Sequence, residues 1–487
     1  MGTYREVQPG PPSSALGVNS SGYLFSWSEV CHSAKAARVV TWLPSRHQRG
    51  GLGERTSIPI SSHERCSSMK RVSYFELLSK VSPAQSALRA AESNRLFAER
   101  PRKRYEGLAP SVQALAEYVK RPENEFLRIY IGSMLDEANQ KNPINIKTPA
   151  DFFQQLDNAL NSLPRYDSNF MAALPFYTVL QPFMENSYGW AFFTNEAVRP
   201  YFAEILKAYH ANLETPASLA YLNDSYGNWL SAEASQYLSL NDYVYDPAQP
   251  HGGFKSWNEF FIRQFKDFDA SRPLAPDPTG KVVISPVDGQ VWTISKQVQR
   301  EAAFELKGEQ YYLTDLLAEN ADSPLLRPFV DGLAVQIVLM PFNYHRWHSP
   351  VTGRIRKVRT VPGYFFAQPA PNQDYAASFP FLSHVNTRTI VFIEPENPAI
   401  GVIAMIFVGL TEVSSCVARV QEGDSVRRGD EIGHFAFGGS TCCMLFDRSK
   451  IASLYITDNA TLSDGASGPG EKLANVVQVR QNIASAL

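Results

Sequence analysis

The spacing of hydrophobic residues divides the chain into a helical half and a strand-rich half. Between residues 74 and 255, apolar residues recur every three or four positions, as in the segment 112–119, and this is the repeat of an amphipathic helix. After residue 256 the repeat changes to every second residue, as in the segment 333–339, which is the repeat of a half-buried strand. The two repeats predict an α+β protein, in which an N-terminal helical domain precedes a β-rich domain of barrel-like or sandwich-like form.

Local signals mark the start of one helix and the boundary between the two predicted domains. Thr148-Pro149-Ala150-Asp151 combines a capping hydroxyl, a proline at the first helical position and an acid in the first turn, which is typical of a helix start. Ser256-Trp257-Asn258-Glu259 has the pattern of a capping box, and the proline-rich segment 269–280 is typical of a linker. We therefore expect domains at 74–255 and 256–487.

The first 73 residues follow neither repeat. They are rich in serine, glycine and proline and contain no hydrophobic segment of a secretory signal. We expect residues 1–73 to form a disordered tail, and because Met69 precedes the first ordered pattern, the sequence leaves open whether residues 1–68 belong to the native protein. A mitochondrial presequence should lack acidic residues, but this segment carries Glu6, Glu29, Glu54 and Glu64.

Amino-acid composition limits the classes of binding partner and the cellular compartment that we expect for this protein. A net charge of −2 over 487 residues offers no basic excess to neutralise phosphates, so we expect no nucleic-acid binding. The five cysteines form no Cys-x-x-Cys pair and suit a reducing compartment better than a disulfide framework. No uninterrupted apolar run reaches the roughly 20 residues of a membrane span. We expect a cytoplasmic protein without membrane attachment, with the mitochondrion as the alternative; the oligomeric state is unknown.

A serine preceded by two glycines, Gly438-Gly439-Ser440, is the first candidate for a reactive group. Glycine tolerates positive φ and lets other atoms come close to its backbone, so Ser440 Oγ can reach the carbonyl carbon of Gly439. The preceding segment 417–435 has the pattern of strands and tight turns, which would hold this connection on a rigid frame. Gly-Gly-Ser is also a common loop sequence, so the catalytic interpretation depends on residues upstream.

Two polar clusters precede this serine in the same half. Asp288 lies in a tight turn after the strand 282–284, and His345 and His348 follow the strand that ends at Met340. The two histidines could bind a metal, but extended geometry would point them apart and no third ligand has matching spacing, so we expect no metal. They could also be structural histidines bonded to the backbone. In the third interpretation, Asp288 orients His348, and His348 activates Ser440 as a nucleophile.

Four motifs, in this order, resemble those of the pyruvoyl-dependent phosphatidylserine decarboxylase family. They are Ser285-Pro-x-Asp288-Gly, Tyr344-His345-Arg-x-His348-x-Pro350, Asn386-x-Arg388 and Gly438-Gly439-Ser440-Thr441. Further segments resemble a soluble fungal, L-tryptophan decarboxylase-like branch of this family, among them Val361-Pro-Gly-x-x-Phe-Ala-Gln-x-Ala and Gly409-x-Thr-Glu-Val-Ser-x-Cys416. The resemblance extends from about residue 75 onward and leaves the tail unmatched.

The resemblance implies that the enzyme makes its cofactor from its own chain. Ser440 Oγ, deprotonated by His348 with Asp288 behind it, attacks the Gly439 carbonyl, and β-elimination cuts the chain between residues 439 and 440. Residue 440 becomes dehydroalanine and then, after loss of ammonia, a pyruvoyl group, whose ketone condenses with the substrate amine and accepts the electrons left by CO2. His345 would assist decarboxylation or protonate Cα. The two cleaved chains are expected to remain associated.

The resemblance favours a free aromatic L-amino acid as substrate, with L-tryptophan converted to tryptamine as the first choice. Phe365, Phe366 and Gln368 are its candidate pocket residues, although packing at a strand end explains them equally well. The alternatives are a phosphatidylserine decarboxylase that makes phosphatidylethanolamine, because the Ser-Pro-x-Asp-Gly motif is shared, or a non-cleaving binding homologue. A pyridoxal-phosphate enzyme is disfavoured, because Lys307 and Lys450 lie in the β-rich half without a phosphate-binding loop.

Overall fold

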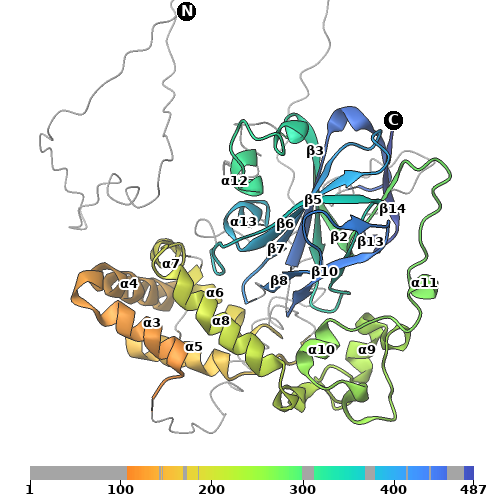
Figure 1. Cartoon of the computed structure of the whole chain (residues 1–487). Coiled ribbons are helices and arrows are strands. Elements are labelled where there is room, and N and C mark those ends of the chain that lie inside the picture. The colour runs from red at the N-terminus through yellow and green to blue at the C-terminus, as the bar shows by residue number, and fades with distance from the viewer. Residues whose placement is uncertain are drawn as a thin grey trace, which may run out of the picture. The chain divides into compact units, whose positions relative to one another are not determined.

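The computed structural model describes residues 107–141, 144, 146–167, 173–184, 186–298, 312–367, 379–412, 415–437, 440–457 and 476–487, all of which fall within one compact unit (Figure 1). Three predictions lie outside these residues: the tail 1–73, the site residue Gly439 and the pocket residue Gln368. The domain boundary near residue 256 stays a prediction.

The first half of the described chain is helical, as its repeat predicts. The buried face of α3 consists of the four apolar residues that the segment 112–119 places on one side. α5 begins at Pro149, and a capping box closes its first turn, because Thr148 Oγ1 accepts the Asp151 N–H (3.1 Å) while the Asp151 carboxylate accepts the Thr148 N–H (2.9 Å). The predicted helix start is confirmed. None of the described helices is long and apolar enough to cross a membrane.

The helices and short 3-10 helices differ in length but most begin at a proline or a capping side chain. The α-helices are α3 (Pro110–Lys120), α4 (Glu125–Lys141), α5 (Pro149–Leu160), α6 (Pro175–Met184), α7 (Ser187–Phe193), α8 (Arg199–Leu213), α9 (Ala232–Leu238), α10 (Trp257–Phe261), α11 (Phe268–Ser271), α12 (Leu313–Leu317) and α13 (Phe379–Val385). The 3-10 helices are η1 (Pro122–Asn124), η3 (Pro216–Tyr221), η4 (Leu240–Asp242), η5 (Pro250–Gly253), η6 (Arg327–Phe329) and η8 (Arg448–Lys450).

The described residues of the second half form three antiparallel sheets. The largest has eight strands in the order β13-β2-β3-β11-β7-β6-β5-β9, and the smaller sheets have the orders β1-β14-β12 and β4-β10-β8. The strands are β1 (Val282–Ile284), β2 (Gly289–Val298), β3 (Gly332–Leu339), β4 (Arg346–His348), β5 (Gly353–Val361), β6 (Arg388–Pro395), β7 (Ile403–Gly409), β8 (Ser415–Ala418), β9 (Ser425–Val426), β10 (Glu431–Ala436), β11 (Ser440–Phe446), β12 (Ile451–Leu454), β13 (Val476–Val477) and β14 (Asn482–Ala486). The α+β class is confirmed, and the described sheets form packed layers rather than a closed barrel.

The eight-stranded sheet is buried on both faces. Along β11, Cys442, Met444 and Phe446 enter the core that also holds Trp347 of β4, which stacks on Phe407 with ring centres 3.9 Å apart. The alternate β11 residues enter a second core on the opposite face, where α12 and α13 pack (Figure 1). Because successive strand side chains point to opposite faces, a continuous apolar run such as β11 fits a strand covered on both sides.

The helical half and the β-rich half share aromatic contacts. Phe366, from the connection after β5, packs its ring 5.5 Å from Phe202 of α8 and 6.2 Å from Phe176 of α6. The linker predicted at 269–280 packs on the β-rich half, where the Ala275 N–H donates to the Arg480 carbonyl (3.1 Å). The two halves are therefore joined by buried side chains as well as by the chain itself.

Substitution of Met444 by alanine tests the importance of the β11 core. The Met444 side chain is fully buried, so Met444→Ala is expected to lower the free energy of unfolding by about 2–5 kcal/mol through lost apolar contact and the cavity left behind. The measurement is urea unfolding followed by circular dichroism. Tyr226→Ala is the control, because Tyr226 is 84% exposed, and its effect should stay within about 0.5 kcal/mol. Equal effects of the two substitutions would contradict the assignment of β11 to the core.

Candidate active site

Ser440 is the first residue of β11 and lies in the middle of the eight-stranded sheet. It pairs with Leu339 of β3 on one side and with Gly409 of β7 on the other. The residue is fully buried, and its Oγ has no hydrogen-bond partner among the described residues. Buried hydroxyls normally have a partner, so this hydroxyl is an exception of the kind that reactive groups show.

The chain reaches Ser440 through a backbone turn at Phe437. Phe437 has a φ of 45°, a left-handed conformation that residues other than glycine seldom adopt. Its ring packs against Trp257 of α10 (ring centres 4.6 Å apart), Tyr209 of α8 (5.4 Å) and Phe261 of α10 (5.8 Å). These three aromatic residues hold the turn in place directly before the predicted cleavage site.

His345 belongs to the same aromatic cluster. Its ring stacks on that of Phe261 at 3.8 Å between ring centres, the side chain is fully buried, and its backbone carbonyl accepts the Phe435 N–H (2.9 Å). Because Phe435 lies near the end of β10, His345 is beside the strand that leads into residue 440. The structure thus places His345 close to the predicted site of chemistry.

His348 lies at the other end of β4, opposite Glu431 at the start of β10. Its Nδ1 is 2.8 Å from the Gly429 carbonyl, which can only accept, so Nδ1 carries the proton and Nε2 accepts the Tyr344 O–H (2.9 Å). Burial lowers the pKa of His348 to about 4. The ring is therefore neutral near pH 7, which is the protonation state that a general base needs.

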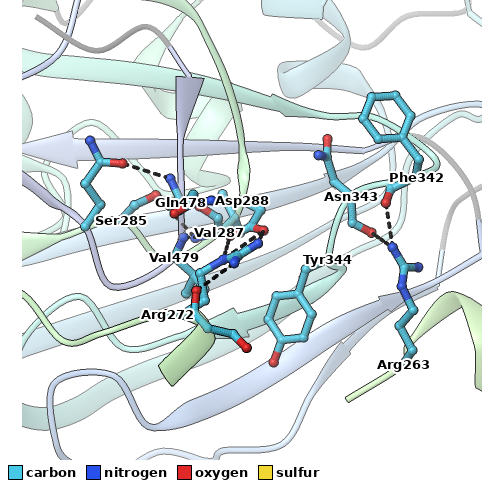
Figure 2. A network of polar contacts seen from close by, with 12 residues as sticks. Arg263, Arg272, Ser285, Val287, Asp288, Phe342, Asn343, Tyr344, Gln478 and Val479 are labelled. Atoms are coloured by element: carbon cyan, nitrogen blue, oxygen red, sulfur yellow. Dashed lines mark hydrogen bonds and ion pairs between the residues drawn. The ribbon is translucent and has the colours of Figure 1, made fainter. Parts of the chain in front are cut away.

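The carboxylate of Asp288 is held by residues other than His348 (Figure 2). Arg272 donates to it from Nε (3.1 Å) and from Nη2 (2.6 Å), and the Val479 N–H donates to Oδ1 (2.7 Å). The direct contact expected between Asp288 and His348 is absent from the hydrogen bonds of the described chain. The physical reason is competition: a guanidinium forms a planar two-donor fork that matches a carboxylate, and Arg272 reaches Asp288 from the end of α11.

The Asn386-x-Arg388 motif supports the strand next to Ser440. Asn386 Nδ2 donates to the carbonyl of Gly409 (2.9 Å), the β7 residue that pairs with Ser440. The buried guanidinium of Arg388 donates to the carbonyls of Asn386 (3.0 Å) and Leu316 (3.0 Å). These contacts tie the ends of β6 and β7 together, so the motif has a positioning role that its sequence alone does not reveal.

An open cavity of about 970 Å³ lies against Phe437, between α8, the segment from η5 to α10, and strands β8 and β10. This volume is within the range of small-molecule sites. Five cationic side chains line the cavity against three acidic ones, and two of the cations, Arg346 and Arg419, are paired with Glu431 behind the wall. The cationic residues are Lys255, Arg263, Lys266, Arg346 and Arg419, and the acidic residues are Glu214, Asp246 and Glu259.

The candidate pocket residues lie elsewhere. Phe365 and Phe366 are buried in the core of the helical half and do not line this cavity. Two residues of the polar network were missed by sequence reasoning: Arg272, which stands in a segment that only composition marks as a linker, and Tyr344, which lies inside a recognised motif. No local signal identifies Arg272, because its partner is set by packing.

Comparison with known proteins matches both halves of the chain. Two family models, each described as phosphatidylserine decarboxylase, match residues 257–466 and 109–238. The chain is 33% identical over 293 residues to an L-tryptophan decarboxylase of Psilocybe cyanescens, covering 55% of this chain and 66% of the relative. It is 33% identical over 324 residues to decarboxylase iboD of Amanita muscaria, covering 62% of this chain and 90% of the relative.

The chain belongs to the phosphatidylserine decarboxylase family. A third relative is the phosphatidylserine decarboxylase proenzyme of Fusobacterium nucleatum, with 29% identity over 241 residues, 47% of this chain and 75% of the relative. The family resemblance of the sequence motifs is confirmed, and the protein is a decarboxylase. Members of this family use a pyruvoyl group, and Ser440 is a buried serine whose hydroxyl has no partner among the described residues.

The neutral state of His348 predicts a loss of stability in acid. Its pKa is about 4 in the folded chain against 6.5 for an ordinary histidine, so the unfolded chain binds more protons between these values. The contribution of the neutral ring to the free energy of unfolding therefore has its full value above pH 6.5. This contribution decreases as the pH falls towards 4, by about 3 kcal/mol in total. Urea unfolding at pH 7 and pH 4.5 should show a smaller difference for His348→Gln than for the wild type. The same difference in both proteins would contradict the burial of a neutral His348.

Proposed function

We propose that the chain matures by cutting itself between Gly439 and Ser440, and that Ser440 is the source of the pyruvoyl group. The observation that carries this proposal is the Ser440 hydroxyl, buried at the start of the central strand and without a partner among the described residues. Attack of Oγ moves the acyl group of Gly439 from nitrogen to oxygen. Elimination then breaks the Cβ–O bond and leaves Gly439 as a carboxylate, and addition of water to residue 440 releases ammonia.

We assign the role of base in this maturation to His348, supported by Asp288. The neutral imidazole has its Nε2 lone pair directed at the Tyr344 hydroxyl, so direct transfer of the Ser440 proton to Nε2 requires that Tyr344 first turn aside. Asp288 acts through Arg272 and the loop at Val479 rather than through a direct contact with the imidazole. Its expected role is to hold these segments in place around the histidine.

His345 is the candidate for the decarboxylation step itself. When present, the pyruvoyl group supplies an electron sink for the electrons left as CO2 departs. His345 lies beside the end of β10 and stacks on Phe261 in the cluster around Phe437, so it is close to the place where that group would form. A histidine can donate or accept a proton near neutral pH, and we assign to it the protonation of the substrate Cα.

The two cleaved chains are expected to stay together. After cleavage, β11 would begin the smaller chain and yet remain between β3 and β7 of the larger one. β14 would still pair with β1, and the Val479 N–H with Asp288. These ladders and the two cores beside β11 must all separate before the small chain can leave, so dissociation requires unfolding.

We propose a free aromatic L-amino acid, with L-tryptophan first, as the substrate. The names of relatives such as the Psilocybe cyanescens enzyme support this choice. So does the size of the cavity beside Phe437, which is within the range of small-molecule sites. Phosphatidylserine is the second candidate, favoured by the name of the Fusobacterium nucleatum relative. The cytoplasmic location stays a prediction.

Self-processing is tested by intact mass measurement under denaturing conditions. The wild type is expected to give two chains that part between Gly439 and Ser440, the smaller with a pyruvoyl mass and no free amine. Ser440→Ala and His348→Gln are expected to leave a single chain. His345→Gln should process and yet lose at least about tenfold in decarboxylation, the low end of a lost proton-transfer catalyst.

Thr441→Val is the matched control for this experiment. Thr441 carries the neighbouring hydroxyl, which already donates to the Ile337 carbonyl (2.9 Å), so its loss should leave processing intact. Native gel filtration should show both chains of the wild type in one peak. A wild type that remains a single chain, or a Ser440→Ala protein that is still cut, would refute the assignment of Ser440.

The substrate is tested with the processed enzyme and a panel of compounds. L-Tryptophan, L-phenylalanine, L-tyrosine and L-serine would be supplied free, and phosphatidylserine in mixed vesicles, with release of CO2 as the measurement. We expect turnover of L-tryptophan with tryptamine as product, and D-tryptophan serves as the control for stereospecific binding. Turnover of the vesicles without turnover of any free amino acid would replace the first candidate by the second.

A further inference from the structure

A fully buried carboxylate that the proposed chemistry does not use lies just beyond the end of β7. The side chain of Glu412 is fully buried, and its two oxygens accept the N–H groups of Phe176 (3.0 Å) and Tyr177 (3.2 Å) in the first turn of α6. A helix N-terminus favours negative charge and needs acceptors for its first N–H groups. Glu412 therefore caps a helix that lies more than 230 residues earlier in the chain.

A histidine of α8 holds the backbone at the same place. His210 Nε2 is 3.0 Å from the Glu412 carbonyl, which can only accept, so Nε2 carries the proton and Nδ1 accepts the Ser415 O–H (2.6 Å). Burial lowers the pKa of His210 and keeps the ring neutral, as this pattern requires. His210 of α8 thus forms hydrogen bonds with both described ends of the connection between β7 and β8, at Glu412 and at Ser415.

The contacts of Glu412 and His210 lie close, along the chain, to segments that contact or precede Ser440. Glu412 stands three residues after Gly409, the β7 residue that pairs with Ser440. On the other side of the processing site, Tyr209, the neighbour of His210 on α8, packs against Phe437 with ring centres 5.4 Å apart. The helical half therefore holds both chain segments that flank Ser440, the end of β7 and the turn after β10.

The buried carboxylate of Glu412 has an energetic cost as well as a role in capping α6. Burial raises the pKa of Glu412 to about 7, although the N–H donors of Phe176 and Tyr177 oppose this shift, and no ion pair with Glu412 exists among the described residues. Burying a charge without a counter-charge costs stability, whereas an apolar residue at this position would leave the N–H groups of Phe176 and Tyr177 without these acceptors. What the carboxylate adds is direction, since two hydrogen bonds (3.0 and 3.2 Å) fix the segment after β7 relative to α6.

We propose that Glu412 is a positioning residue for self-processing: together with His210 it fixes the end of β7 to the helical half, and through Gly409 it sets Ser440 for attack on the Gly439 carbonyl. This inference rests on the proposed function. It gives the helical half a task in maturation, in which its helices hold the reacting segment rather than contributing a reacting group.

The test compares the rates of self-processing of freshly refolded chains, followed by intact mass over time. Glu412→Gln keeps the size of the side chain but points an amide N–H2 at a backbone N–H. We expect it to fold, with a lower thermal midpoint, and to process at least about tenfold more slowly, since small displacements of reacting groups have effects of this size. Asp151→Asn is the matched control, because it makes the same change at the cap of α5, away from the site. It should lower the thermal midpoint and leave the rate of processing unchanged.

Two variants of His210 provide an independent arm if Glu412→Gln does not fold. His210→Gln retains one N–H donor and one acceptor, whereas His210→Ala retains neither, so processing should be slow in the alanine variant and substantially restored in the glutamine variant. Processing at the wild-type rate by Glu412→Gln, or equal rates in the two His210 variants, would overturn the positioning role alone. A wild type that never cleaves would overturn the proposed function and this inference with it.

Discussion

The pairing of β11 with β3 and β7 is the constraint on which the candidate site depends. It places Ser440 at the first position of a strand that is hydrogen-bonded on both sides and buried on both faces. A loop serine would have to be ordered before each reaction, whereas this one is held by the ladder from its first residue onward. The same ladder explains how the chain can be cut here without falling apart, because the strand after the cut is paired on both sides along its whole length.

Helices outside the sheet complete this arrangement: α6 and α8 of the helical half, and α10 at the start of the second half. Tyr209, Trp257 and Phe261 close around Phe437, and Glu412 and His210 join the end of β7 to α6 and α8. The segment that carries the predicted scissile bond therefore runs between two anchored ends. The left-handed conformation of Phe437 persists because the surrounding aromatic rings over-determine its position, and Phe437 stands three residues before Ser440.

The polar network behind the site differs from the simple triad that the motifs suggest. Asp288, His348 and Ser440 stand in the expected order in the chain, yet Asp288 is bonded to Arg272, and His348 to Gly429 and Tyr344. In the uncleaved chain, these neighbours neutralise the charge of Asp288 and satisfy the hydrogen-bonding groups of Asp288 and His348. A catalytic role for the three residues consequently involves Arg272 and Tyr344 as well, and the roles proposed for them concern a connected group rather than a set of isolated side chains.

Four features could be predicted correctly without a structure: the order of a helical half and a β-rich half, the start of α5, the strand that contains residues 333–339, and the family. Each of these features depends on residues that lie a few positions apart in the chain, because hydrophobic periodicity, helix capping and motif spacing are local patterns. Only the tertiary structure decided which partner each polar group has: Val479 lies 191 residues from Asp288, Gly429 lies 81 residues from His348, and Phe176 lies 236 residues from Glu412. It also placed Phe366 in the helical core, away from the cavity. Such partners are chosen by packing between distant segments, because burial forces each polar group to bond to whatever the fold brings beside it.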